Sequence, residues 1–267
     1  MKAEVKKITP EMATEWLKRN KSNRHLSERH INLYEDQMRA GKWMLTGSPI
    51  MFDDKNNLLD GQHRLNAVVR FGKPVEFLVC EGLSPDTFKV IDTGKNRSAG
   101  DVLSVKGITN PTRTAAIAIS IILFRNGYFS QNSGEGRRKS YATNSDVLKF
   151  VQDQSGFDEI VQYASEIVRN FRFVPLSTIG CLYFILSKKN QTKADQFFEK
   201  YAKGIDLSEQ SSVRVLRDRL IRDSQNKTKL SGRDKMALII MAWNNFLTNK
   251  KTQQLKLANN YNFPKPL

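Results

Sequence analysis

The segment from Leu58 to Phe71 constrains the fold of this chain more than any other. The apolar pair Leu58-Leu59 is followed by Asp60-Gly61-Gln62-His63-Arg64 and then by a run of helical character. This order predicts a strand that turns into a helix at Gly61. The first turn of a helix presents unpaired backbone N–H groups and the positive end of the helix dipole, which together bind phosphate well.

Within this junction, Gly61, Gln62 and Arg64 are the candidate phosphate-binding residues, because the planar guanidinium of Arg64 suits phosphate oxygens. His63 beside the positive end of a helix is expected to be neutral, and it can act as a base, donate a hydrogen bond to phosphate or simply pack. Asp60 can hold a metal ion or cap the helix. The catalytic candidates at this junction are therefore His63 and Asp60.

A second junction of the same kind follows the apolar pair Val90-Ile91. It contains Asp92, Thr93, Gly94 and Arg97. In the functional interpretation, this junction forms the opposite wall of the same pocket. Thr93, Gly94 and Arg97 would bind phosphate, and Asp92 would bind a metal ion or water. The alternative is an ordinary Asp-x-Gly turn with a solvent-exposed arginine.

Hydrophobic patterning divides the chain near residue 108. Residues 1–108 predict an α+β domain, with helices beginning after Thr9 and Ser27, a hairpin over 49–59 and a strand over 75–80. Residues 109–267 predict an all-α domain, with a first helix that starts at Asn110-Pro111 and further helices near 145–154, 157–170, 176–188, 192–202, 209–224 and 231–249. The longest apolar stretch, Ala115 to Phe124, is too short to span a bilayer and predicts a buried helix.

The positive charge is concentrated in the second part. The chain has a net charge of +16, of which residues 1–109 carry only +4, with 18 Lys and Arg against 14 Asp and Glu. Such an asymmetry favours a polyanionic partner, usually nucleic acid. The candidate nucleic-acid-binding residues lie in a Gly/Ser-rich loop and in one helix: Arg137, Arg138, Lys139, Arg214, Arg217 and Arg222. For each of these sets, an ordinary solvated surface is the alternative.

Two features indicate a reducing, cytoplasmic setting. Cys80 and Cys181 are far apart in the sequence and show no CxxC spacing, so neither a disulfide framework nor a zinc site is expected. The first seven residues lack the apolar core of a signal peptide.

The segment Gly61 to Ala67 reads G-x-x-R-x-x-A and resembles the phosphate-binding signature of the ParB/sulfiredoxin superfamily, in its DGQHR form. The resemblance covers roughly residues 8–105. It implies a ParB/sulfiredoxin-like fold for the N-terminal domain and a nucleotide phosphate held by Gly61 and Arg64. Gln62 stands where sulfiredoxins carry their reactive Cys, so reductase chemistry is not expected.

These observations lead to three hypotheses. The first is a nucleotide-binding protein that acts at DNA and hydrolyses a phosphoanhydride or phosphodiester bond, with a nucleoside triphosphate as cofactor and Asp60 and Asp92 as ligands of Mg²⁺. The second is a non-enzymatic DNA-binding regulator or partition-like adaptor. The third is a small-molecule kinase or transferase.

Overall fold

The computed structural model describes every residue of the chain except 22, 24, 90–96, 131–141 and 227–228. The chain forms two compact units, Met1–Asn96 and Arg97–Leu267. The division lies before the predicted boundary at residue 108 because helix α4 (Ala99–Val105) packs on α5 (Pro111–Arg125) of the second unit. With a small mixed sheet and a helical remainder, the fold is α+β, as predicted.

The first unit contains a four-stranded sheet with the order β1-β4-β2-β3. Its strands are β1 (Lys2–Ile8), β2 (Ile50–Asp53), β3 (Leu58–Asp60) and β4 (Val75–Leu83). Strands β1 and β4 pair antiparallel, β2 and β4 pair parallel, and β2 and β3 form the predicted hairpin. Strand β1 was not predicted from the sequence.

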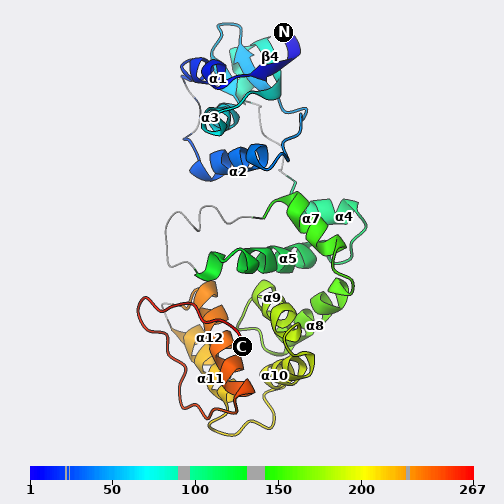
Figure 1. Ribbon diagram of the computed structural model, residues 1–267, viewed down its shortest axis with the longest axis vertical. Helices are drawn as coiled ribbons and strands as arrows, with labels where there is room; N and C mark the ends of the chain where they lie inside the picture. The colour runs from blue at the N-terminus through cyan, green and yellow to red at the C-terminus, as the bar shows by residue number, and fades with distance from the viewer. Residues whose placement is uncertain (22, 24, 90–96, 131–141, 227–228) are drawn as a thin grey trace. The chain divides into compact units, whose positions relative to one another are not determined.

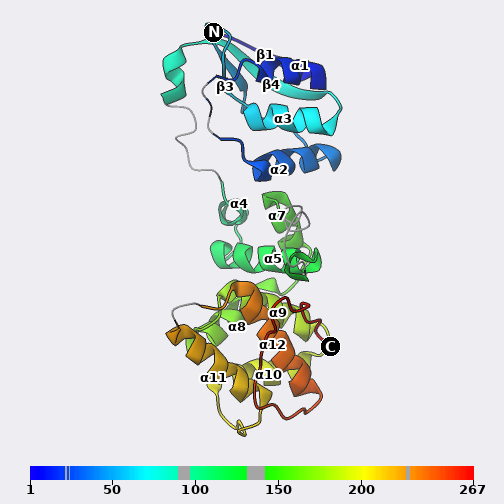
Figure 2. The ribbon, with the colours of Figure 1, turned by 90° about the vertical axis from the view of Figure 1, so that its left-hand side faces the viewer.

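The first unit also contains three helices: α1 (Pro10–Leu17), α2 (Glu28–Arg39) and α3 (Gln62–Phe71). Helix α3 lies between the sheet and α2, and α1 packs beside α3 (Figures 1 and 2). A short 3₁₀ helix, η1 (Pro85–Lys89), follows β4. The core between the sheet and the helices includes Phe52, Phe77 and Leu65, which are almost fully buried.

The second unit is helical, as predicted. After α4 and α5 and the 3₁₀ turn η2 (Tyr128–Ser130), its elements are α7 (Asn144–Gln152), α8 (Phe157–Asn170), α9 (Leu176–Ser187), α10 (Gln191–Lys203), α11 (Ser212–Gln225) and α12 (Gly232–Leu247). Helix α5 lies between α4 and α7 on one side and α9 on the other (Figures 1 and 2), which explains why it is apolar around most of its circumference.

The helix starts follow from their capping residues. Thr9 accepts a hydrogen bond from the backbone N–H of Met12, and Ser98, Thr143 and Ser231 each form a capping box with an aspartate three residues later. Trp243 is fully buried on α12, as its position on the apolar face predicted. Among the described helices, none combines the length and the apolar character needed to cross a membrane.

Candidate functional site

The junction at residues 60–64 has the predicted backbone course. Strand β3 ends at Asp60, Gly61 takes the left-handed conformation with φ of 109°, and α3 begins at Gln62. A side chain at Gly61 would collide with Ile50, because an added Cβ would lie 2.5 Å from the Cδ1 atom of Ile50. Glycine is therefore required here both by backbone conformation and by close packing against β2.

The guanidinium of Arg64 is engaged within the protein. It donates hydrogen bonds to the backbone carbonyls of Ser48 and Pro49, and its Nη2 atom lies 2.7 Å from Oδ2 of Asp60. The residue is 8% exposed. Arg64 thus ties the segment before β2 to the end of β3, and a phosphate would have to displace these partners.

Gln62 and His63 tie the α1–α2 connection to the start of α3. The side-chain amide of Asn20 donates to Oε1 of Gln62 at 2.9 Å, and the backbone N–H of Ser27 donates to Nε2 of His63 at 2.9 Å. Because Nε2 accepts a hydrogen bond, it carries no proton in this arrangement. His63 therefore uses its Nε2 atom to hold the backbone of Ser27.

Residues 61–65 are all buried, so the N-terminus of α3 is covered by its own chain in this structure. The carboxylate of Asp60 pairs with Arg64, and Asp92 lies outside the described residues. In the part of the chain that the structure describes, no three His, Cys, Asp or Glu side chains gather into a potential metal site. Phosphate binding by Gly61, Gln62 and Arg64 and metal binding by Asp60 therefore stay predictions that require this junction to open.

The second predicted cluster falls largely outside the described residues, which end at Lys89 and resume at Arg97. Asp92, Thr93 and Gly94 are among those not described. Arg97 belongs to the second unit, where its side chain is exposed and its backbone carbonyl accepts a hydrogen bond from Asn144 at 2.9 Å. A pocket shared between the two junctions stays a prediction.

The arginines of α11 separate into two groups. Arg214 and Arg222 are exposed, as a nucleic-acid-binding face requires. Arg217, in contrast, donates to the carbonyls of Tyr201 and Ala202 at the end of α10, and its guanidinium lies 4.0 Å from the ring centroid of Phe171. Burial lowers the pKa of Arg217 from its usual value. The placement of Arg217 on the exposed basic face was wrong, because it caps α10 from the inside.

The remaining basic candidates, Arg137, Arg138 and Lys139, lie outside the described residues. On α11, Arg214 has a distant acidic partner, with its Nε atom 3.9 Å from Oδ2 of Asp218. Arg219, which is half-buried, and Arg222 have no acidic partner within 4 Å among the residues described. The outward face of α11 therefore carries unneutralised positive charge.

A small cavity that the sequence did not predict lies beside the β2–β3 hairpin. It has a volume of about 220 Å³ and is lined by Lys21, Asn23, Asp53, Asn57, Leu58, Leu59 and Pro85. Burial raises the pKa of the Asp53 carboxyl, but hydrogen bonds from the side chain and backbone of Asn57 and from the backbone of Lys55 outweigh it, so the pKa lies below its ordinary value. The Asp-rich turn was the only sequence signal for this carboxylate.

Comparison with known proteins gives no match: no family model, no curated protein and no solved structure corresponds to this chain.

Proposed function

We propose that this protein is a non-enzymatic DNA-binding protein, a regulator or adaptor, whose helical unit binds the sugar–phosphate backbone. The observation that carries the proposal is the charge of that unit. Residues 97–267 hold 27 Lys and Arg against 14 Asp and Glu, a balance of +13. A surface with this excess attracts DNA through release of the counterions condensed on its phosphates.

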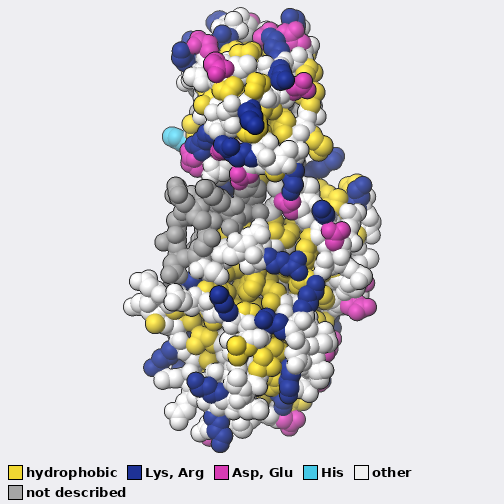
Figure 3. All heavy atoms as spheres, in the orientation of Figure 1, with side chains coloured by type: hydrophobic (Ala, Val, Ile, Leu, Met, Phe, Trp, Pro, Cys, Tyr) yellow, Lys and Arg dark blue, Asp and Glu magenta, His cyan; other side chains and the backbone are white. Residues whose placement is uncertain are grey.

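The placement of the charges supports the proposal. Figure 3 shows Lys and Arg side chains scattered over the visible face of the helical unit, with few Asp and Glu side chains among them. Arg214 and Arg222 are both exposed to solvent on α11, about two helical turns apart. Dispersed, exposed cations of this kind suit contacts with phosphates rather than with base edges, so the binding should depend little on sequence.

The geometry of residues 60–64 favours this hypothesis over hydrolysis of a nucleotide or of DNA. The side chains expected to hold phosphate, pass a proton and bind Mg²⁺ hold chain segments together instead. The resemblance to the ParB/sulfiredoxin superfamily is compatible with an adaptor role, because that superfamily includes DNA-partitioning proteins.

Salt dependence tests the proposal directly. We expect the affinity for a labelled 30-base-pair duplex, measured by fluorescence anisotropy, to fall steeply with NaCl, roughly 40-fold between about 50 and 200 mM for three phosphate contacts. The combined variant Arg214→Gln/Arg222→Gln should bind more weakly, with the slope of log K against log[salt] reduced by about two.

The matched control removes the same amount of charge from the other unit. Lys7 and Lys73 are exposed residues of the first unit, and Lys7→Gln/Lys73→Gln should leave the slope unchanged. If both double variants lost the same amount of DNA affinity, only the net charge of the chain would matter. That result would reject the α11 face as the DNA-binding surface. Release of phosphate from ATP, CTP or GTP in the presence of Mg²⁺ and DNA would reject the non-enzymatic assignment.

A further inference from the structure

Strand β1 forms one edge of the sheet in the first unit. It has seven residues and pairs only with β4. In an antiparallel pair, every second residue directs its N–H and C=O groups away from the partner strand. Among the residues that the structure describes, none makes a backbone hydrogen bond to these outward groups of β1. The edge can therefore accept another extended strand.

The charges of β1 and β4 balance, although the chain as a whole carries +16. The two strands together contain three lysines and three glutamates: Lys2, Lys6, Lys7, Glu4, Glu76 and Glu81. The register places Lys2 opposite Glu81 and Lys7 opposite Glu76. Lysines on an edge strand normally discourage association, but here each has a glutamate on its own or the neighbouring strand. Two copies can therefore meet at this edge without the repulsion that their net charge causes elsewhere.

Glu4 and Lys6 keep hydrogen-bonding capacity beyond their contacts within the chain. Lys2 and Lys6 both contact the Oε1 atom of Glu4, at 3.1 and 2.8 Å, whereas no described residue contacts its Oε2 atom. The Nζ atom of Lys6 also lies 3.1 Å from Oε1 of Glu81. Because an ammonium group has three N–H donors, that of Lys6 has one donor left. The strand thus offers a free carboxylate oxygen and a free ammonium donor two residues apart.

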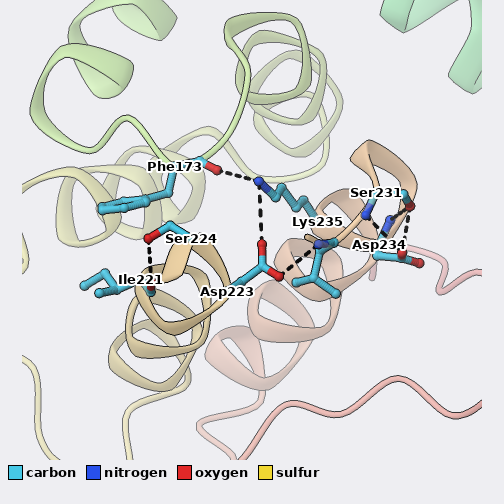
Figure 4. A network of polar contacts seen from close by, with 8 residues as sticks. Phe173, Ile221, Asp223, Ser224, Ser231, Asp234 and Lys235 are labelled. Atoms are coloured by element: carbon cyan, nitrogen blue, oxygen red, sulfur yellow. Dashed lines mark hydrogen bonds and ion pairs between the residues drawn. The ribbon is translucent and has the colours of Figure 1, made fainter. Parts of the chain in front are cut away.

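This pair is accessible to a second molecule, unlike the charges inside the helical unit. In Figure 4, Asp223 of α11 and Lys235 of α12 lie within the chain, where 4% and 18% of their side chains are exposed. The side chains of Glu4 and Lys6 are 36% and 27% exposed. The pair in Figure 4 holds its own chain together, whereas the Glu4–Lys6 pair can also contact another copy.

We propose that β1 pairs antiparallel with β1 of a second copy, with Val5 on the two-fold axis. Val5 is 55% exposed and lies against its equivalent in this arrangement. Glu4 of each copy lies opposite Lys6 of the other copy, so the two intrachain pairs join into a ring of alternating charges.

The charges of β1 select this register over its neighbours. An axis at Glu4 places the two Glu4 carboxylates opposite each other, and an axis at Lys6 does the same with the two Lys6 ammonium groups. Like charges directly opposite each other destabilise a strand pair. The interface is independent of the DNA-binding role, because it uses no residue of α11.

Sedimentation velocity of the full chain without DNA tests this interface. We expect a monomer–dimer equilibrium that shifts toward dimer as the protein concentration rises. Val5→Lys puts two ammonium groups opposite each other at the axis and should weaken the dimer roughly tenfold or more. Val105→Lys is the matched control and should have no effect, since Val105 is 78% exposed and lies on α4 of the other unit.

An exchange of charges tests the register. Glu4→Lys and Lys6→Glu each create like-charge pairs across the axis, so each variant alone should dimerise roughly tenfold more weakly than the wild type. In an equimolar mixture, every charge again meets its opposite. The average sedimentation coefficient of the mixture should therefore exceed that of either variant at the same total concentration. Glu15→Lys and Lys18→Glu, which reverse an exposed ion pair of α1, should show no gain on mixing.

Three results would overturn the proposal: a wild type that stays monomeric at every concentration, a dimer that Val5→Lys leaves intact, or a mixture of the charge variants that shows no recovery. Recovery on mixing cannot arise from a folding defect of the single variants. If Lys6→Glu melts early because it loses its contact with Glu81, Val5→Lys decides the test, since the exposed side chain of Val5 can be replaced without disturbing the core.

Discussion

The carboxylate of Asp53 organises the turn between β2 and β3. Its Oδ1 atom accepts hydrogen bonds from the backbone N–H groups of Lys55 and Asn57 at 2.9 and 2.7 Å, and its Oδ2 atom accepts one from the side chain of Asn57 at 2.8 Å. In Asp53→Asn, the amide nitrogen replaces one acceptor, so we expect a loss of about 1–2 kcal/mol in the free energy of unfolding at pH 7, measured by urea titration.

The free energy of unfolding that Asp53→Asn loses should be smaller at acidic pH than at neutral pH. The pKa of Asp53 is lower in the folded protein than its ordinary value of 3.8, so its contribution is present above about pH 4 and disappears as the pH falls through the folded pKa. The difference between wild type and Asp53→Asn should therefore shrink at pH 3. Asp54→Asn, at the exposed neighbouring position, is the control and should change stability little at either pH.

The guanidinium of Arg64 holds three parts of the first unit together. Because its guanidinium bridges Asp60 and two carbonyls, we expect Arg64→Lys to lower the free energy of unfolding by about 2 kcal/mol without any ligand present. Arg70→Lys on the same helix is the matched control, since Arg70 is exposed and pairs with the exposed Glu28, and should have a smaller effect. Equal stabilities of wild type and Arg64→Lys would contradict a structural role and return Arg64 to the phosphate hypothesis.

At the scale of single elements, Gly61 sets the boundary between β3 and α3. Gly61→Ala combines an unfavourable φ with a contact of 2.5 Å to Ile50, so we expect a loss of about 3 kcal/mol in thermal or urea unfolding. Gly72→Ala, at the other end of α3, has φ of 74° but nothing within 4 Å and should lose only about 1 kcal/mol.

A double-mutant cycle separates the two contributions at Gly61. Ile50→Val removes the Cδ1 atom that lies closest to the added methyl group. Gly61→Ala should therefore be less destabilising in the Ile50→Val background than in the wild type. Identical losses in both backgrounds would mean that backbone strain alone requires glycine.

Local signals explain which elements could be predicted. The capping residues Thr9, Ser98 and Ser231 mark helix starts with short-range hydrogen bonds that the sequence specifies directly. Strand β1 was missed because it is an edge strand that pairs only with β4 and buries only Ile8 fully, so its charged sequence shows little hydrophobic pattern.

The candidate site was predicted less completely, because its contacts join segments far apart in the sequence. The junction at Gly61 was found, but the partners of Arg64 at Ser48 and Pro49 depend on tertiary packing. Arg217 could have been predicted: with Val213, Leu216 and Leu220 it completes an i, i+3, i+4, i+7 pattern, which is the buried face of a helix.

For the whole molecule, the two units have separate sets of buried hydrophobic residues. The cluster of the second unit extends from Ala99 to Phe263 and includes the tail after α12 through Leu255 and Phe263. We therefore expect residues 97–267 to fold when expressed alone, with cooperative thermal unfolding followed by the helical circular dichroism signal.

The isolated second unit can also show which part of the chain binds DNA. Since residues 97–267 carry +13 of the total +16, the fragment should bind the same duplex with a slope of log K against log[salt] close to that of the full chain. Residues 1–96 alone should bind the duplex at least tenfold more weakly at low salt. A fragment of the second unit that folds but binds no DNA, while the full chain binds, would assign the contact to the first unit or to both units together.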